Sequence, residues 1–302
     1  MAARSAASLA ASLAFRLKAE RRRYRKRLER CQRKFSESAV HDLRIETRRL
    51  LALLDLLRAL HGPGPLRKTR KVFKQRLDAF DELRDTHVQL SLLKPLRCQF
   101  PAARELEARL CRRELRLADE LHREVWATKP ARSERRLKTV EKELREVSAR
   151  MPRAAARRAV LAALRKAFHR VVLLRRRIHP KRPATIHRTR VAFKRFRYLC
   201  ELLRSYLPGL KVEGLGRMRD YQAMMGNIQD IEVLLAGVRG AVADKEISGR
   251  AVGPLRQELL RRRRELINIY LAAANRLYDF EPNAKCSEIQ SSQAKLTHDT
   301  YV

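Results

Sequence analysis

The sequence predicts an all-α protein made of two similar halves. Ala, Leu, Arg, Lys and Glu dominate the chain, and only 10 of its 302 residues are glycine, so the composition favours helices. No alternating run rich in Val, Ile and Thr occurs between turn residues, which argues against strands. A basic amphipathic segment at residues 40–57 has a second copy at residues 186–203, and this recurrence indicates an internal repeat.

Turn-forming residues separate the expected helices. The clearest stops are the Gly-Pro-Gly-Pro run at 62–65 and the prolines Pro130, Pro152, Pro208 and Pro254. The expected helices are residues 4–34, 38–60, 65–97, 101–128, 132–149, 153–178, 185–206, 211–238 and 254–280.

The repeat also predicts the domain organisation. His187 follows His41 by 146 residues and Asp230 follows Asp85 by 145, so two landmarks keep their register within one residue. A long Arg-rich helix precedes each histidine, which indicates two helical bundles. The expected domains are a first bundle at 1–150, a second bundle at 151–280 and a disordered polar tail at 281–302.

The charge of the chain limits the class of its partner. Lys and Arg number 70 against 33 Asp and Glu, a formal net charge of +37, while the hydrophobic share of 45% is ordinary for a folded protein. A compact polycation repels itself, and a bound polyanion relieves that repulsion and releases counterions. The candidate partners are therefore nucleic acid, an anionic membrane surface and polyphosphate.

Cysteine usage and hydropathy indicate the compartment. The five cysteines, an odd number without metal-ligand spacing, are expected to be free thiols in a reducing environment. No apolar run reaches the ~20 residues of a membrane span. Residues 1–19 have the Ala, Ser and Arg content of an organellar transit peptide, but we interpret them as the front of the first helix. We expect a soluble, cytoplasmic protein without a metal or cofactor.

Each copy of the repeated helix carries a column of cations on one face. At about 100° per residue, a histidine and the basic residues three and seven positions later point the same way. An Arg fork holds a phosphate through two hydrogen bonds, so a column of such donors suits a chain of phosphates. A solvated charged face is the alternative, and recurrence in register favours a binding site. The columns are His41, Arg44 and Arg48 in the first copy, and His187, Arg190, Lys194 and Arg197 in the second.

Helix caps and neighbouring helices are expected to complete both sites. Ser38 and Thr185 are the expected N-caps, which would place the histidines near a first turn, where anions are favoured. Asp85 and Asp230 are expected either to hold an Arg of the neighbouring histidine helix or to form an ordinary ion pair between helices. Further expected contacts, with plain surface charge as the alternative for each, are Arg23, Arg27, Arg70, Lys71, Lys74, Arg170 and Arg219.

The motifs themselves resemble those of a known family. H-x-x-R-x-x-x-R-R at residues 41–49, H-x-x-R-x-x-x-K-R at 187–195 and L-R-D at 83–85 are similar to motifs of the CHAD family, an α-helical domain named for its histidines. The likeness extends to about residue 280. It implies two four-helix bundles related by a pseudo-twofold, a basic groove or pore between them, and binding of inorganic polyphosphate. The ligands it implicates are His41, Arg44, Arg48, Arg49, His187, Arg190, Lys194 and Arg195, to which the helical column adds Arg197.

Two features depart from the family pattern. Gln229 stands where the first half has Arg84, so the secondary contacts of the two halves differ. The phosphatase-like domain often fused to the family does not precede the helices, which predicts a stand-alone binder.

Other functions have less support in the residues. His41-Asp42 imitates the metal-binding HD pair of phosphohydrolases, but the second copy reads His187-Arg188, and no phosphate loop or nucleophile elbow occurs. Aromatic residues are only 6% of the chain and form no stacking platform for bases, and the single Trp126 gives no membrane anchor. We therefore predict a non-enzymatic polyphosphate binder that is recruited to polyphosphate granules. Non-specific nucleic-acid binding is the main alternative, and phosphohydrolase activity is a disfavoured one.

Overall fold

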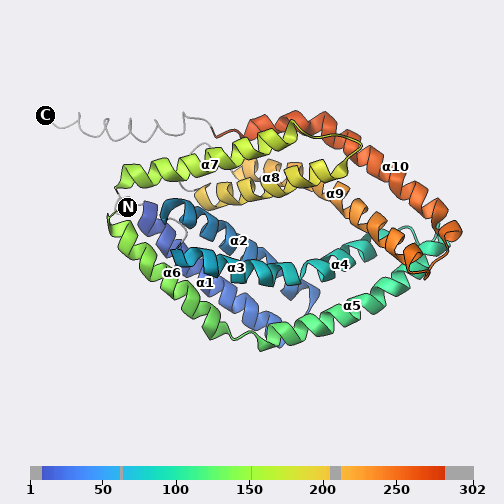
Figure 1. Ribbon diagram of the computed structural model, residues 1–302, viewed down its shortest axis with the longest axis horizontal. Helices are drawn as coiled ribbons and strands as arrows, with labels where there is room; N and C mark the ends of the chain where they lie inside the picture. Colours follow the sequence, from blue (N-terminus) through green and yellow to red (C-terminus); the bar gives the residue numbers. More distant parts are fainter. Residues whose placement is uncertain (1–8, 62–63, 151, 205–211, 283–302) are drawn as a thin grey trace. The chain divides into compact units, whose positions relative to one another are not determined.

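The protein is all-α, as expected. The computed structural model describes residues 9–61, 64–150, 152–204 and 212–282, and within these ranges it contains helices and no strand (Figure 1). The helices are α1 (Leu9–Arg33), α2 (Glu37–His61), α3 (Gly64–Ala79), α4 (Asp81–Leu93), α5 (Pro101–Ala127), α6 (Pro130–Arg150), α7 (Arg153–Arg175), α8 (Pro183–Leu203), α9 (Val212–Ala243), α10 (Gly249–Ala273) and the 3-10 helix η2 (Ala274–Phe280). Nearly all of the expected tail at 281–302, and the first residues of the chain, lie outside the described residues.

Proline begins three of the helices. Pro101, Pro130 and Pro183 stand at the start of α5, α6 and α8, where a missing N–H removes no helical hydrogen bond. Pro254 behaves differently from its expected role as a stop, because α10 starts earlier, at Gly249. At the sixth helical position Pro254 removes only one hydrogen bond near the helix start, which the packing of α10 tolerates.

Three other expectations about helix ends are wrong. The single helix expected at 65–97 is interrupted at Phe80, where α3 ends and α4 begins. The cap of α2 is Ser36, whose Oγ accepts the N–H of Ala39 at 3.3 Å, and not Ser38. Thr185 lies inside the first turn of α8, where its hydroxyl donates to the carbonyl of Arg182 at 2.7 Å. The two histidines consequently lie just beyond the first turn of their helices.

The turn after α9 is a Schellman motif. The N–H of Glu246 donates to the carbonyl of Ala241 at 3.0 Å, and the N–H of Lys245 donates to that of Val242 at 3.1 Å. Lys245 takes the left-handed conformation, φ 56°, that this motif requires at its C′ position. The turn reverses the chain, so α10 begins beside the end of α9.

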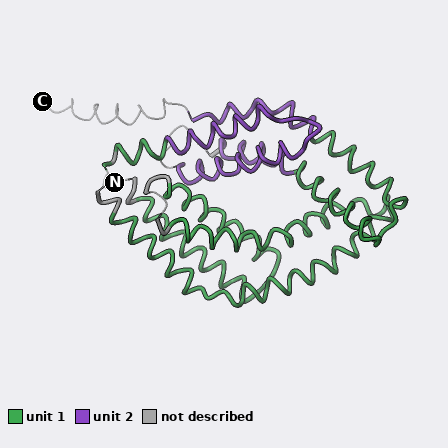
Figure 2. The backbone as a smooth tube through the Cα atoms, viewed as in Figure 1, with its two compact units in different colours: residues 1–161, 227–266 green, residues 162–226, 267–302 purple. Residues whose placement is uncertain are grey.

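The described chain divides into two compact units (Figure 2). Unit 1 comprises residues 1–161 and 227–266, and unit 2 comprises residues 162–226 and 267–302. Unit 1 therefore holds α1 to α6 together with the second part of α9 and most of α10. These boundaries follow contacts and not the sequence repeat, and the repeat and its division into bundles at 1–150 and 151–280 stay predictions.

Unit 1 has two groups of packed helices. In the first, α1 packs against α2 and α6, and α2 packs against α3, around buried side chains such as Leu17, Leu54 and Phe73. In the second, α4 and α5 share a core with the later part of α9 and with α10. Gly237 of α9 makes this approach close, because a Cβ there would clash with Oε1 of Gln89 on α4.

Unit 2 has an aromatic core. Phe193 of α8 lies 4.9 Å from Tyr221 of α9 and 5.8 Å from Phe280 of η2, measured between ring centroids. The Tyr221 hydroxyl donates to the carbonyl of Ala274 at 3.1 Å, which satisfies its polar group within the core. The apolar face expected for residues 186–203 is buried here, and the opposite face of α8 is directed away from this core.

Candidate functional site

The cations of the α2 column differ in exposure. His41 is exposed, Arg48 is half-buried, and Arg49 is half-exposed. Arg44 is only 4% exposed, and its Nη2 donates to Oδ1 of Asp81 at 2.9 Å. Arg44 therefore ties α2 to the start of α4, while the other three present their charges to solvent.

The electrostatics of Arg44 show the strain of this arrangement. Burial lowers the pKa of Arg44 most, the nearby charges of Arg48 and Arg84 lower it further, and Asp81 opposes them. Its Nη1 is buried and has no hydrogen-bond partner among the described residues. An additional negative group near Arg44 and Arg48 would thus be electrostatically favourable.

A buried pair of carboxylates lies beside the same column. Glu20 of α1 and Glu46 of α2 are 2% and 3% exposed. Arg23 binds both, with its Nε 3.3 Å from Oε1 of Glu46, and Nη1 of Arg49 lies 3.6 Å from Oε2 of Glu46. Burial, followed by the hydrogen bond and charge of Glu20, raises the pKa of Glu46 to about 7. The charge state of this pair, and with it the hold on Arg49, changes near neutral pH.

The two aspartates of the repeat bind one arginine. Nη1 of Arg84 donates to Asp85 and Nη2 donates to Asp230, both at 2.9 Å. Burial opposes the charge of Arg84, but the two carboxylates raise its pKa. Arg84 of α4 and Asp230 of α9 thus form an ion pair between helices, which is the second of the two roles expected for the aspartates. Arg44 of the first histidine helix is held by Asp81.

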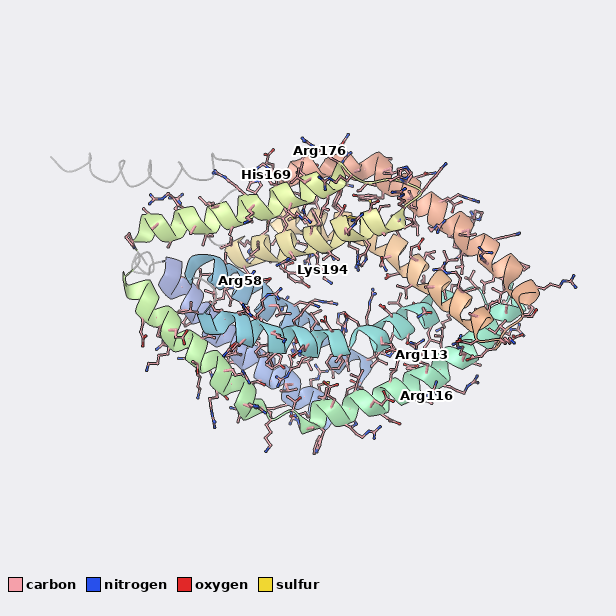
Figure 3. All side chains as sticks on the ribbon, viewed as in Figure 1. Arg58, Arg113, Arg116, His169, Arg176 and Lys194 are labelled. Carbon is pink, nitrogen blue, oxygen red and sulfur yellow. The ribbon has the colours of Figure 1, made fainter. Side chains whose placement is uncertain are left out.

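The α8 column lies wholly in unit 2. His187 is half-buried, and its Nδ1 has no hydrogen-bond partner in the described part of the chain. Arg190 packs over Gly226 of α9: a Cβ added to this glycine would lie 3.6 Å from Nε of Arg190. Lys194 is half-buried and Arg195 is exposed; Figure 3 marks Lys194 on α8 and Arg58 on α2.

Arg197 does not belong to the exposed face. It is 7% exposed, its Nε donates to Oε1 of Gln222 at 2.9 Å, and it also pairs with Glu201. Its guanidinium lies 4.6 Å from the centroid of the Tyr198 ring. The expectation that Arg197 lies on the polar face of the helix is wrong, because α9 covers that side of α8.

The secondary cations are mostly engaged within their own unit. Arg70 pairs with Asp55 of α2, Arg27 pairs with Asp42 at 2.8 Å, and Lys74 pairs with Asp78. Asp42, the acid of the apparent HD pair, also pairs with Arg30, and the described residues contain no group of three metal-ligating side chains. The remaining members, Lys71, Arg170 and Arg219, are exposed.

Sequence reasoning missed two residues that shape the α2 column. Asp81 is 37 positions from Arg44, and no local pattern connects them. Glu46 is an acid on the core side of the basic helix α2. Glu20 has the same position on the preceding helix, and these two acids could have been noticed in the sequence. A search for buried like charges between predicted neighbouring helices would have found this pair.

The fold and the composition define a strongly basic, all-helical domain with histidine and arginine on two of its helices. The chain belongs to the CHAD family, since the family model described as the CHAD domain matches residues 15–239. A similar solved structure is the crystal structure of the CHAD domain from the plant Ricinus communis, with 18% identity and a TM-score of 0.66 over 88% of this chain and 92% of that one. No curated protein matches the sequence. The CHAD fold expected from the motifs is thus confirmed, and CHAD domains are in general binding domains associated with polyphosphate.

No helix in the described ranges is both long enough and apolar enough to cross a membrane.

Proposed function

We propose that this protein binds inorganic polyphosphate, without cleaving it, through the histidine faces of α2 and α8. The observation that carries the proposal is that both helices present a histidine and two cations at the same motif positions. His41, Arg48 and Arg49 do so on α2, and His187, Lys194 and Arg195 do so on α8. Membership of a family associated with polyphosphate supports it, as does the net charge of +37.

The buried members of the two columns have a different role in this proposal. Arg44 and Arg197 are positioning residues, because each is engaged by carboxylates or an amide of its own unit. Arg44 also adds positive potential beneath Arg48, while its own guanidinium stays inside the bundle. Arg190 is half-buried, so its exposure lies between that of the exposed binding residues and that of the buried positioning residues.

One polymer can engage several cations, which suits the spacing of the columns. Each phosphate neutralised by Lys or Arg releases counterions, so binding is strongly salt-dependent. A long chain that engages one column is held near the molecule, and a second column then binds it at a high effective concentration. Short chains gain less from this effect. The groove implied by the family resemblance stays a prediction.

The test compares two polyanions of matched charge. Long-chain polyphosphate and a mixed-sequence oligonucleotide are titrated against the wild type and against Arg49→Gln/Arg195→Gln, with affinity read by anisotropy. We expect polyphosphate to bind more tightly than the oligonucleotide and the double variant to lose roughly tenfold or more in polyphosphate affinity. Arg112→Gln/Arg116→Gln, which removes two exposed charges of α5, is the control. Equal affinities for the two ligands would favour the nucleic-acid alternative.

Recruitment to polyphosphate granules follows from the same proposal. A tagged copy should form foci that disperse when cellular polyphosphate is depleted. The Arg49→Gln/Arg195→Gln variant should form fewer foci than the Arg112→Gln/Arg116→Gln control at equal expression. Foci that persist after depletion would contradict recruitment by polyphosphate.

A further inference from the structure

A second cationic surface lies on the face of α1 that packs against α6. An open cleft of about 380 Å³ is formed there within unit 1. Its cations are Arg21, Arg22, Arg25 and Lys26 of α1 and Lys138 of α6. None of them belongs to the α2 or α8 columns. The two acids of the cleft are Glu29 and Glu134, so five cations face two carboxylates.

The local sequence explains why these charges converge. Arg21 and Arg25 are one helical turn apart, as are Arg22 and Lys26, so the two pairs form adjacent rows on α1. Helix α6 packs directly against α1 and contributes Lys138 one turn after Glu134. The cleft is thus built by two rigid helices and needs no loop to close it.

Arg21 is the buried member of the cleft lining. It is 8% exposed, pairs with Glu134, and has its Nη2 3.5 Å from Oε2 of Glu141. Its Nε is buried without a hydrogen-bond partner among the described residues. The cleft is thus lined in part by a buried guanidinium with an N–H that has no acceptor, and such a group is stabilised by an additional acceptor.

Glu134 holds the cations together in the absence of a ligand. Its Oε2 accepts a hydrogen bond from Nη1 of Arg25 at 2.8 Å, and its Oε1 lies 3.6 Å from Nζ of Lys138. Partial burial alone would raise the pKa of Glu134, but the charges of Lys138, Arg25 and Arg21 hold it below its usual range. Glu134 therefore contacts three cations, but Arg25 also pairs with Glu29 and Arg21 also lies near Glu141, so the positive excess of the cleft comes from its remaining cations.

Arg22 and Lys26 supply that excess. Both are exposed at the edge of the cleft, and neither pairs with a carboxylate of the described residues. We propose that this cleft binds a compact, soluble anion that carries several phosphate groups. Arg22, Lys26 and Lys138 bind the outer phosphates of this anion. Arg25 redirects one guanidinium N–H from Glu134 to the anion.

The lining selects the class of ligand. All seven side chains are charged, so the cleft offers no apolar wall on which a nucleobase or an acyl chain would pack. Its volume of about 380 Å³ is that of a small-molecule site. Clustered phosphates match five converging cations better than a single carboxylate does, because arginine binds phosphate with two parallel hydrogen bonds.

The test uses inositol hexakisphosphate, a compact soluble ring of phosphates, in calorimetric titrations. Every protein carries Arg49→Gln/Arg195→Gln, so that binding at the α2 and α8 columns is weakened and does not obscure the result. Adding Arg22→Gln/Lys26→Gln should weaken affinity roughly tenfold, whereas adding Arg112→Gln/Arg116→Gln, the same charge loss at the same spacing on α5, should change it less than twofold. Equal losses in the two variants would overturn the proposal in favour of diffuse charge attraction.

A second pair of variants acts in the opposite direction. Glu134→Gln should tighten binding several-fold because it removes a negative charge that contacts three cations of the cleft, while Glu105→Gln removes one exposed acid of α5 and should have little effect. Melting curves report whether each variant is folded. An equal gain in the two would contradict the site. Binding to vesicles that carry a phosphoinositide, without binding to the free anion, would contradict a soluble ligand. Loss of polyphosphate binding elsewhere leaves these outcomes unaffected.

Discussion

Arg84 donates one guanidinium nitrogen to Asp85 and another to Asp230, so a single cation joins the two aspartates that the sequence repeat places in corresponding positions. The corresponding position of the second copy is Gln229, which leaves one cation for two carboxylates. Gln229 is the departure from the family pattern noted in the sequence. The aspartate beside it, Asp230 of α9, therefore shares Arg84 of α4 with Asp85.

Removal of Arg84 should destabilise unit 1. In Arg84→Ala, Asp85 and Asp230 lose their common partner and repel each other, so the free energy of unfolding should fall by about 1–3 kcal/mol. Urea denaturation measures the change. The double variant Arg84→Ala/Asp230→Ala should lose less than the sum of the two single changes, and Arg112→Ala serves as the surface control. Strict additivity would show that the ion pair contributes nothing.

Gly237 should be sensitive to a single methyl group. A Cβ there would displace the terminal amide of the buried Gln89 side chain and its hydrogen bond to the carbonyl of Asp85, so Gly237→Ala should lower the free energy of unfolding by about 1 kcal/mol. Gly240, one turn later on α9, has nothing within 4 Å of an added Cβ. Gly240→Ala should therefore stabilise the helix by about 0.5–1 kcal/mol. Shortening Gln89 to Ala should restore much of the loss in Gly237→Ala.

The stability of the α1–α2 pair should depend on pH through Glu46. Its folded pKa of about 7 lies above the ordinary value of 4.5, so the folded state binds the proton more tightly than the unfolded state. Stability from this group is full below the unfolded pKa and is lost as pH rises through about 7. Glu46→Gln should be more stable than the wild type at pH 8, with a smaller difference at pH 5. Urea midpoints across this range measure it.

Polyphosphate binding should draw a proton onto the buried carboxylate pair. A phosphate at Arg49 competes with Glu46 for that guanidinium and adds negative charge nearby, and both effects favour protonation of Glu46. Calorimetry near pH 7 in buffers of different ionisation enthalpy should therefore show net proton uptake. The uptake should vanish in Glu46→Gln. Equal uptake in this variant would assign the proton to another group.

The four cysteines in the described part of the chain should separate into two classes of reactivity. Cys98 and Cys111 are exposed, whereas burial raises the pKa of Cys31 to about 11 and that of Cys200 to about 12. A thiol reagent at pH 8 should modify the exposed pair rapidly and the buried pair only on unfolding. Peptide mapping by mass spectrometry identifies each site. Rapid labelling of Cys200 would show that the aromatic core of unit 2 opens readily.

Local patterns predicted the helices well, because amphipathic periodicity and proline act over a few residues. The buried face of residues 186–203 and the stops at Pro130 and Pro152 are examples. The column of cations was predicted less well. A helical wheel gives the direction of a side chain but not how far the neighbouring helix extends over it, so the burial of Arg197 under α9 could not be read from spacing. Asp81 and Arg44 meet only through tertiary packing.

The discontinuity of unit 1 has a consequence for its synthesis. The core shared by α4 and α5 is completed by Leu234 and Leu255, which follow unit 2's first segment along the chain. While the ribosome is still translating the middle of the message, the apolar faces around Leu106 and Leu110 lack the helices α9 and α10 that complete their cover. A nascent polypeptide of this length is exposed to aggregation until the later residues emerge, and a fragment cut at the repeat boundary would retain that exposure permanently.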